Sequence, residues 1–65
     1  MPLIRIDMWE GRDPATKEAI VKRVTTAVAE ELGISEKHVW VILDEQPKVN
    51  WGIGGTMGPD LNTKD

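Results

Sequence analysis

Hydrophobic and polar residues alternate at the start of the chain. Over residues 2–9 one set of alternate positions is apolar, Ile4, Ile6 and Met8, and the other is Leu3, Arg5, Asp7 and Trp9. A repeat of two residues is that of a β-strand with two distinct faces. Proline at position 2 suits the first residue of a strand, because a strand tolerates a missing N–H donor there. The pattern predicts a strand over residues 2–9.

The spacing of apolar residues becomes helical after Asp13. Asp13 followed by Pro14 is a helix start, an N-cap acceptor and then a proline at the first helical position. The residues that should form the buried stripe are Ile20, Val24, Ala27, Val28 and Leu32. Gly33 is a natural C-terminal stop. The predicted helix, residues 14–32, would be roughly 28 Å long.

A second strand is predicted over Val39–Leu43, where β-branched and aromatic residues follow one another and end near Asp44 and Glu45. The run is nearly continuous in apolar residues, which favours a strand covered on both faces. Ser35 is placed to cap one short helical turn before it. Two strands joined by a helix are usually parallel, with a right-handed crossover.

The glycines of Gly52-Ile53-Gly54-Gly55 predict a β-hairpin near the end of the chain. The expected fold class is therefore α/β: a β-α-β unit with parallel strands, one long helix and a C-terminal β-hairpin, in a single domain over residues 1–65. Such a unit leaves sheet edges unpaired, and unpaired edges favour pairing with other chains.

Length and composition point to an assembly as well. A chain of 65 residues buries only about 60% of its unfolded surface. Small proteins compensate with disulfides, metals or partners, and this chain has no cysteine and a single histidine. We therefore expect a symmetric homo-oligomer.

Charge and hydropathy argue against nucleic acid and a membrane as partners. The net charge is −3, and the eight Lys and Arg residues form no basic stripe, so nucleic acid is not expected as a partner. No apolar run is long enough for a membrane span, and the start of the sequence lacks the charged-then-apolar pattern of a secretory leader, so neither is expected. The absence of cysteine fits a cytoplasmic protein.

Pro2 is the residue with the clearest chemical potential. If Met1 is removed, the Pro2 nitrogen becomes a secondary amine held on a strand. Apolar surroundings and a nearby cation both disfavour the charged form of an amine, which leaves it able to accept and return a proton. Arg12, in the loop after the first strand, can bind a carboxylate through its planar fork. Taken alone, each residue also has an ordinary reading, a strand start and a surface arginine.

Other candidates are weaker. Gly52–Gly55 lacks the lysine of a phosphate-binding loop, and Pro59 stands where a helix should begin. His38 has no cysteine or second histidine to form a metal site. All three aromatic residues are tryptophans, Trp9, Trp40 and Trp51. Trp51, between a loop and the glycines, is the least typical of a core.

Together these features resemble the 4-oxalocrotonate tautomerase family. The resemblance is carried by Pro2 at a strand start, Glu10-Gly11-Arg12 after it, the long helix, Val39–Ile42 and Gly52–Gly55. It implies a cofactor-free tautomerase, an isomerase, built from dimers that usually form a hexamer. It also implies a small carboxylate as substrate.

The resemblance implies a role for each matching residue. Pro2 would be the general base that takes a proton from an enol hydroxyl and returns it to a distant carbon. Arg12 would bind a substrate carboxylate, and Trp51 would pack on the substrate. Apolar wall positions fall on Met8, Trp9 and Ile53.

Trp40 departs from the family pattern, because the prototype has a second arginine at this position. An indole donates one hydrogen bond but cannot balance a carboxylate. The substitution favours a monocarboxylate or a more apolar enol over 4-oxalocrotonate. Trp40 is expected either in the pocket wall or in interface packing.

Two alternatives remain open at this stage. One is a hydration-type dehalogenation of a haloacrylate, which needs a carboxylate to activate water, with Asp44 or Glu45 as the candidates. The other is a non-catalytic oligomeric module in which Pro2 is only a strand start. If Met1 is retained, the Pro2 nitrogen is an amide and cannot act as a base.

Overall fold

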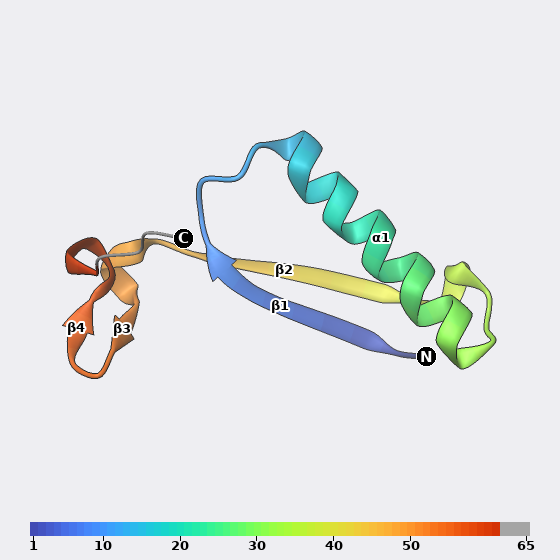
Figure 1. Ribbon diagram of the computed structural model, residues 1–65. Helices are drawn as coiled ribbons and strands as arrows, with labels where there is room; N and C mark the ends of the chain where they lie inside the picture. The colour runs from blue at the N-terminus through green and yellow to red at the C-terminus, as the bar shows by residue number, and fades with distance from the viewer. Residues whose placement is uncertain (62–65) are drawn as a thin grey trace.

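Two parallel strands with one long helix across them form the main body of the protein (Figure 1). The computed structural model describes residues 1–61. Strand β1 (Leu3–Trp9) pairs in parallel with β2 (Trp40–Gln46), from Leu3 beside Trp40 to Trp9 beside Gln46. The predicted β-α-β unit is confirmed. The second strand begins one residue later than predicted and continues to Gln46.

Helix α1 (Pro14–Leu32) has the predicted bounds. The Asp13 carboxylate accepts the backbone N–H of Thr16 at 2.8 Å, with Pro14 as the first helical residue. At the other end, Gly33 adopts the left-handed conformation, with φ 67°, and donates its N–H to the carbonyl of Ala29. A left-handed residue here is much less strained as glycine, which is why the helix ends at Leu32.

The inner face of α1 differs in part from the predicted stripe. Ile20, Val24 and Val28 are half-buried and Ala29 is buried, but Ala27 and Leu32 are exposed. At 100° per residue, Ala27 lies at the edge of the buried stripe. Leu32 shares the inner direction but stands in the last turn, where this chain covers little of it.

The two-stranded sheet has one covered face and one open face. Residues paired across parallel strands point to the same side. The side of Ile4, Ile6 and Met8 lies under α1 and is half-buried, whereas Leu3, Trp40 and Ile42 on the opposite side are 53%, 55% and 43% exposed. The prediction of cover on both faces of the second strand is wrong for the single chain, which has only one helix to place on the sheet.

The predicted hairpin is confirmed. Strands β3 (Gly52–Ile53) and β4 (Thr56–Met57) pair antiparallel through a turn in which Gly54 and Gly55 have positive φ. Gly58 donates its N–H to the Trp51 carbonyl at 2.7 Å, and a Cβ atom at Gly58 would overlap the carbonyl of Lys48. The hairpin is therefore docked onto the segment that follows β2.

Three short 3₁₀ turns complete the described chain. The first, η1 (Glu36–His38), is capped by the Ser35 hydroxyl as predicted, and the others are η2 (Lys48–Asn50) and η3 (Gly58–Asp60). The segment after the hairpin is mostly polar in sequence, and its residues 62–65 lie outside the described part.

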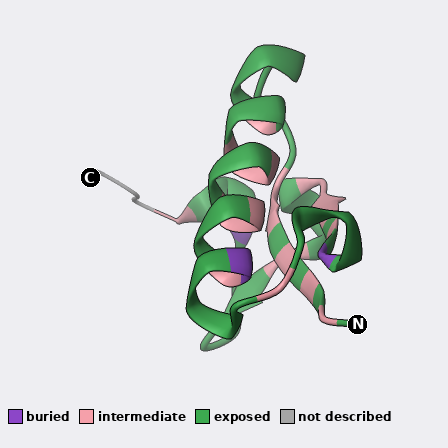
Figure 2. Cartoon of the chain, turned by 90° about the vertical axis from the view of Figure 1, so that its right-hand side faces the viewer, coloured by how far each residue is buried: buried purple, intermediate pink, exposed green. Residues whose placement is uncertain are grey.

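Little of the chain is buried (Figure 2). Over residues 1–61, Ala29 and Val39 are the only apolar side chains classed as buried. The accessible surface is 5044 Å², against about 4,200 Å² expected for a folded monomer of this mass. The radius of gyration is 14.8 Å, against about 11 Å for a compact chain of this length. The chain alone does not enclose a full core.

Candidate active site

Pro2 stands at the amino end of the sheet. Its carbonyl accepts the backbone N–H of Trp40 at 3.0 Å, so the residue is fixed to the start of β2. Pro2 is half-buried and Met1 is 79% exposed. Trp40 projects on the open face next to Leu3, its partner in the strand register. This end of the sheet combines a rigidly held Pro2 with exposed apolar side chains.

Two tryptophans meet at the carboxyl end of the sheet. The rings of Trp9 and Trp51 have their centroids 6.0 Å apart and planes at 82°, an edge-to-face contact. The ammonium of Lys48 lies 4.7 Å from the centroid of the Trp9 ring. The Trp9 indole Nε1 is buried and has no hydrogen-bond partner in residues 1–61. We call Trp9, Lys48 and Trp51 the indole cluster.

Arg12 lies in the connection just beyond this end of the sheet. The strand pairing extends one step past β1, where the Glu10 N–H donates to the Gln46 carbonyl at 3.0 Å. Gly11 then takes a φ of 123°, which turns the chain toward α1. Arg12 is exposed, and it makes no ion pair with the part of the chain that the structure describes. Ile53 is 57% exposed on the hairpin.

The candidate residues divide into two groups at opposite ends of β1 (Figure 1). Pro2 and Trp40 are at the amino end, while Trp9 and Trp51 are at the carboxyl end, with Arg12 and Ile53 in the segments that continue from it. Pro2 and Trp9 are seven residue steps apart along the strand, about 23 Å. A substrate that touches both Pro2 and Arg12 therefore needs residues from two chains.

Asp44 and Glu45 are both engaged in ion pairs. Asp44 accepts hydrogen bonds from Arg5 and from the Gln46 side-chain amide. Glu45 pairs with Lys17 of α1 at 2.8 Å. Within residues 1–61, no group of acidic, histidine or cysteine side chains is arranged to hold a metal ion. Over the same residues, no helix has the length and apolar character needed to cross a bilayer.

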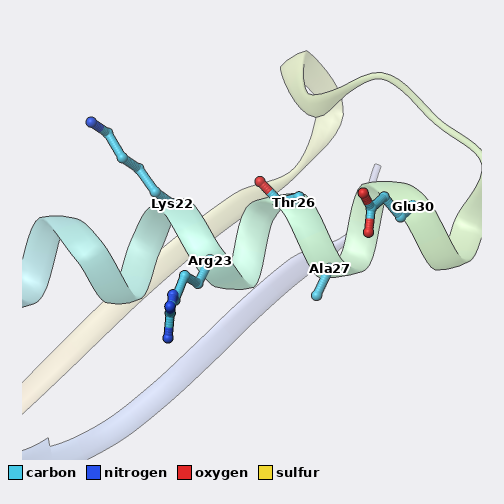
Figure 3. A pocket seen from close by; sticks show the side chains of 5 residues that line it. All are labelled: Lys22, Arg23, Thr26, Ala27 and Glu30. Atoms are coloured by element: carbon cyan, nitrogen blue, oxygen red, sulfur yellow. The ribbon is translucent and has the colours of Figure 1, made fainter.

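The surface of α1 carries a shallow hollow of about 290 Å³. Its lining comes from one helix alone, Lys22, Arg23, Thr26, Ala27 and Glu30 (Figure 3). In Figure 3 the long Lys22 and Arg23 side chains point away from each other. None of the candidate site residues lines this hollow.

Lys48 was not singled out from the sequence. It lies in the loop after the second strand, and no spacing rule relates it to Trp9. Their contact arises because the hairpin docks at the backbone of Lys48, through Gly58 and Trp51. Only the folded chain reveals that a lysine stands beside the Trp9 indole.

Comparison with known proteins decides the family. The profile described as "Tautomerase enzyme" matches residues 2–60. The chain belongs to the tautomerase family. This confirms the resemblance noted in the sequence.

Tautomerases of known name align along nearly the whole chain. Proteins named 2-hydroxymuconate tautomerase from Comamonas testosteroni and Pseudomonas putida are 39% and 41% identical over 61 residues, which cover 94% of this chain and 97% of each relative. As tautomerases are isomerases, the chain is a keto–enol isomerase.

Solved structures agree with the fold. TomN, described as a 4-oxalocrotonate tautomerase homologue in the tomaymycin biosynthetic pathway, superposes with a TM-score of 0.87 at 37% identity and covers 91% of both chains. A protein described as a heterohexamer 4-oxalocrotonate tautomerase from Chloroflexus aurantiacus J-10-fl superposes with a TM-score of 0.88 at 31% identity. The match covers 95% of this chain and 100% of the other.

Proposed function

We propose that this tautomerase works without a cofactor and uses the Pro2 nitrogen, freed by removal of Met1, as its general base. The observation that carries the proposal is the position of Pro2: it is held at the sheet end by the 3.0 Å bond from Trp40, in a chain of the tautomerase family. Because Met1 is 79% exposed, an aminopeptidase has access to it. Pro2 is then an amine fixed on a rigid strand.

The reaction needs one group that moves a proton between two atoms of the substrate. The free Pro2 amine takes the proton from the hydroxyl of an enol and delivers it to a carbon of the conjugated system, which gives the ketone. The amine ends the cycle in the state in which it began. Arg12 binds a carboxylate of the substrate and draws electron density toward it.

The rest of the pocket comes from a second chain. Trp9, Trp51 and Ile53 form apolar walls at the carboxyl end of the sheet, about 23 Å from Pro2 of the same chain. The exposed sheet face and the small core support assembly, and we take a homohexamer, a trimer of dimers, as its form. Trp40 contributes to the wall where the Pro2 end of one chain meets the hairpin end of another.

The substrate class is a small carboxylated enol or 2-oxo acid. The charge of Arg12 supports the carboxylate, and the apolar walls support the conjugated chain. Two relatives carry the name 2-hydroxymuconate tautomerase, so 2-hydroxymuconate is the first substrate to assay.

A dehalogenase has less support than a tautomerase. Activation of water requires a free carboxylate, and the two candidates, Asp44 and Glu45, are already paired with Arg5 and Lys17. No observation favours a non-catalytic module over an enzyme in a chain of this family.

The test is the variant Pro2→Ala, assayed with 2-hydroxymuconate by absorbance. A primary amine can replace the base only poorly, so we expect kcat to fall at least about a hundredfold, in line with the contribution of a general base, while native mass spectrometry shows the same oligomer. Intact mass should show that active protein lacks Met1. Unchanged turnover in Pro2→Ala, or full activity in protein that retains Met1, would rule the mechanism out.

A further inference from the structure

Lys48 is a cation held beside the proposed substrate walls. Its ammonium lies 4.7 Å from the centroid of the Trp9 ring, and Trp9 contacts Trp51 edge to face. An ammonium on the face of an indole is attracted by the ring's negative face. It still keeps three N–H donors, and a ring cannot accept them all. The contact places the charge beside the Trp9 ring, and Lys48 is exposed, so its N–H donors are open to a ligand.

No carboxylate of residues 1–61 neutralises this charge. The acidic side chains nearest to it in sequence, Asp44 and Glu45, are paired with Arg5 and Lys17. Arg12, three residues after Trp9, makes no ion pair in the same part of the chain either. The indole cluster thus contains one cation, Lys48, and a second, Arg12, lies in the connection that follows Trp9; neither is paired with a carboxylate in residues 1–61.

We propose that Lys48 is a second carboxylate-binding residue of the active site, so that the substrate is a dicarboxylate enol. Arg12 takes one carboxylate and Lys48 the other, with the conjugated chain against the indole rings. This inference rests on the proposed function of the site. It also revises the expectation drawn from Trp40: the positive charge that Trp40 lacks is supplied by Lys48 from the hairpin end.

Two substrates that differ by one carboxylate test this assignment. One is 2-hydroxymuconate, and the other is 2-hydroxyhexa-2,4-dienoate, which has a methyl group in place of the distal carboxylate. In Lys48→Met, an apolar chain can still pack on Trp9, but the charge is gone. We expect KM for the dicarboxylate to rise about tenfold, the usual effect of one lost charge-assisted hydrogen bond, with kcat and the monocarboxylate kinetics nearly unchanged.

Two further variants separate charge from structure. Lys48→Arg keeps the cation and should retain most of the preference for the dicarboxylate. Lys37→Met removes an exposed lysine from η1, at the other end of β2. It should leave kcat and KM unchanged for both substrates. A purely structural role of Lys48 would impair both substrates equally in Lys48→Met. Equal losses, or no loss, overturn the proposal.

A binding measurement keeps the proposal testable if neither enol is turned over. Adipate, a saturated dicarboxylate, and hexanoate, its monocarboxylate counterpart, are titrated while tryptophan fluorescence is recorded. Wild-type protein should bind adipate more tightly than hexanoate, and Lys48→Met should lose that difference. The absence of turnover would then count against the enzyme mechanism alone, whereas equal binding of adipate by wild type and Lys48→Met, or no binding at all, would refute the role of Lys48.

Discussion

The carboxylate of Asp13 accepts the N–H of Thr16 at 2.8 Å and thereby satisfies one of the free donors at the start of α1. Hydrogen bonding by Thr16, through its side chain and then its backbone, lowers the pKa of Asp13. A lowered pKa means that folding favours the ionised carboxylate. The stabilisation that the Asp13 cap gives to the start of α1 therefore depends on pH.

Acid should weaken the protein through this cap. Because the folded pKa of Asp13 lies below the unfolded one, the stabilisation is complete above the unfolded pKa, about 3.9, and is lost as pH falls through the folded pKa. Asp13→Asn keeps a capping side chain that does not titrate, so its urea midpoint should fall less than that of wild type between pH 6 and pH 3, at one protein concentration.

The control for this comparison is Asp13→Ala, which removes the cap at every pH. It should be less stable than Asp13→Asn already at pH 6. The same decrease with acid in wild type and Asp13→Asn would show that the cap has no part in the pH dependence.

At the scale of elements, an ion pair joins the first turn of α1 to the end of β2. Lys17 and Glu45 are 2.8 Å apart, with side chains 32% and 24% exposed. Partial burial weakens solvent screening, so the pair holds the helix over the sheet more firmly than a surface pair would. Glu18 and Lys22, an exposed i,i+4 pair at 3.6 Å, offer the matched surface case.

Double-mutant cycles should separate these two pairs. With Lys17→Met and Glu45→Gln we expect a coupling free energy of about 1 kcal/mol, at the upper end for pairs open to solvent. With Glu18→Gln and Lys22→Met we expect about 0.3 kcal/mol. Chemical denaturation of the four variants of each cycle gives both values. A coupling between Lys17 and Glu45 no larger than that of the surface pair would contradict the role given to it.

At the scale of the whole molecule, the open face of the sheet leaves large apolar side chains exposed to solvent. Leu3, Trp40 and Ile42 lie exposed on it, next to the ion pair of Arg5 and Asp44. An exposed apolar face of this kind is typical of a protein interaction surface. In the proposed assembly, a second chain covers it.

Ile42→Asp should disrupt that assembly. It places a charge in the middle of the open face, where burial against another chain would require desolvation of the carboxylate. We expect a shift from the oligomer to smaller species in native mass spectrometry and sedimentation, with loss of activity because the two-chain site is no longer formed. Ala19→Asp, an exposed position on α1, is the control and should remain assembled. An intact oligomer in Ile42→Asp would exclude this face as the interface.

The elements, and the limits of the helix, could be predicted from the sequence. Asp13-Pro14 and Gly33 set the ends of α1, and the glycines of residues 52–55 set the hairpin. These features depend on side chains and backbone groups a few residues apart, so the local sequence contains all the information required. Alternation in β1 likewise separated its two faces, because the period of a strand is fixed.

Contacts between distant residues were decided only by the tertiary structure. It brings Lys48 onto Trp9 through the docked hairpin, and it leaves Ile42 exposed because one helix cannot cover both faces of a sheet. It also places Trp40 beside Leu3 at the Pro2 end of the sheet, and Trp51 against Trp9 at the other end. The sequence by itself determined the elements, the family resemblance and the candidate residues. Which of those residues meet within one chain depended on the strand register and on the docking of the hairpin, because both join residues that are far apart in the chain.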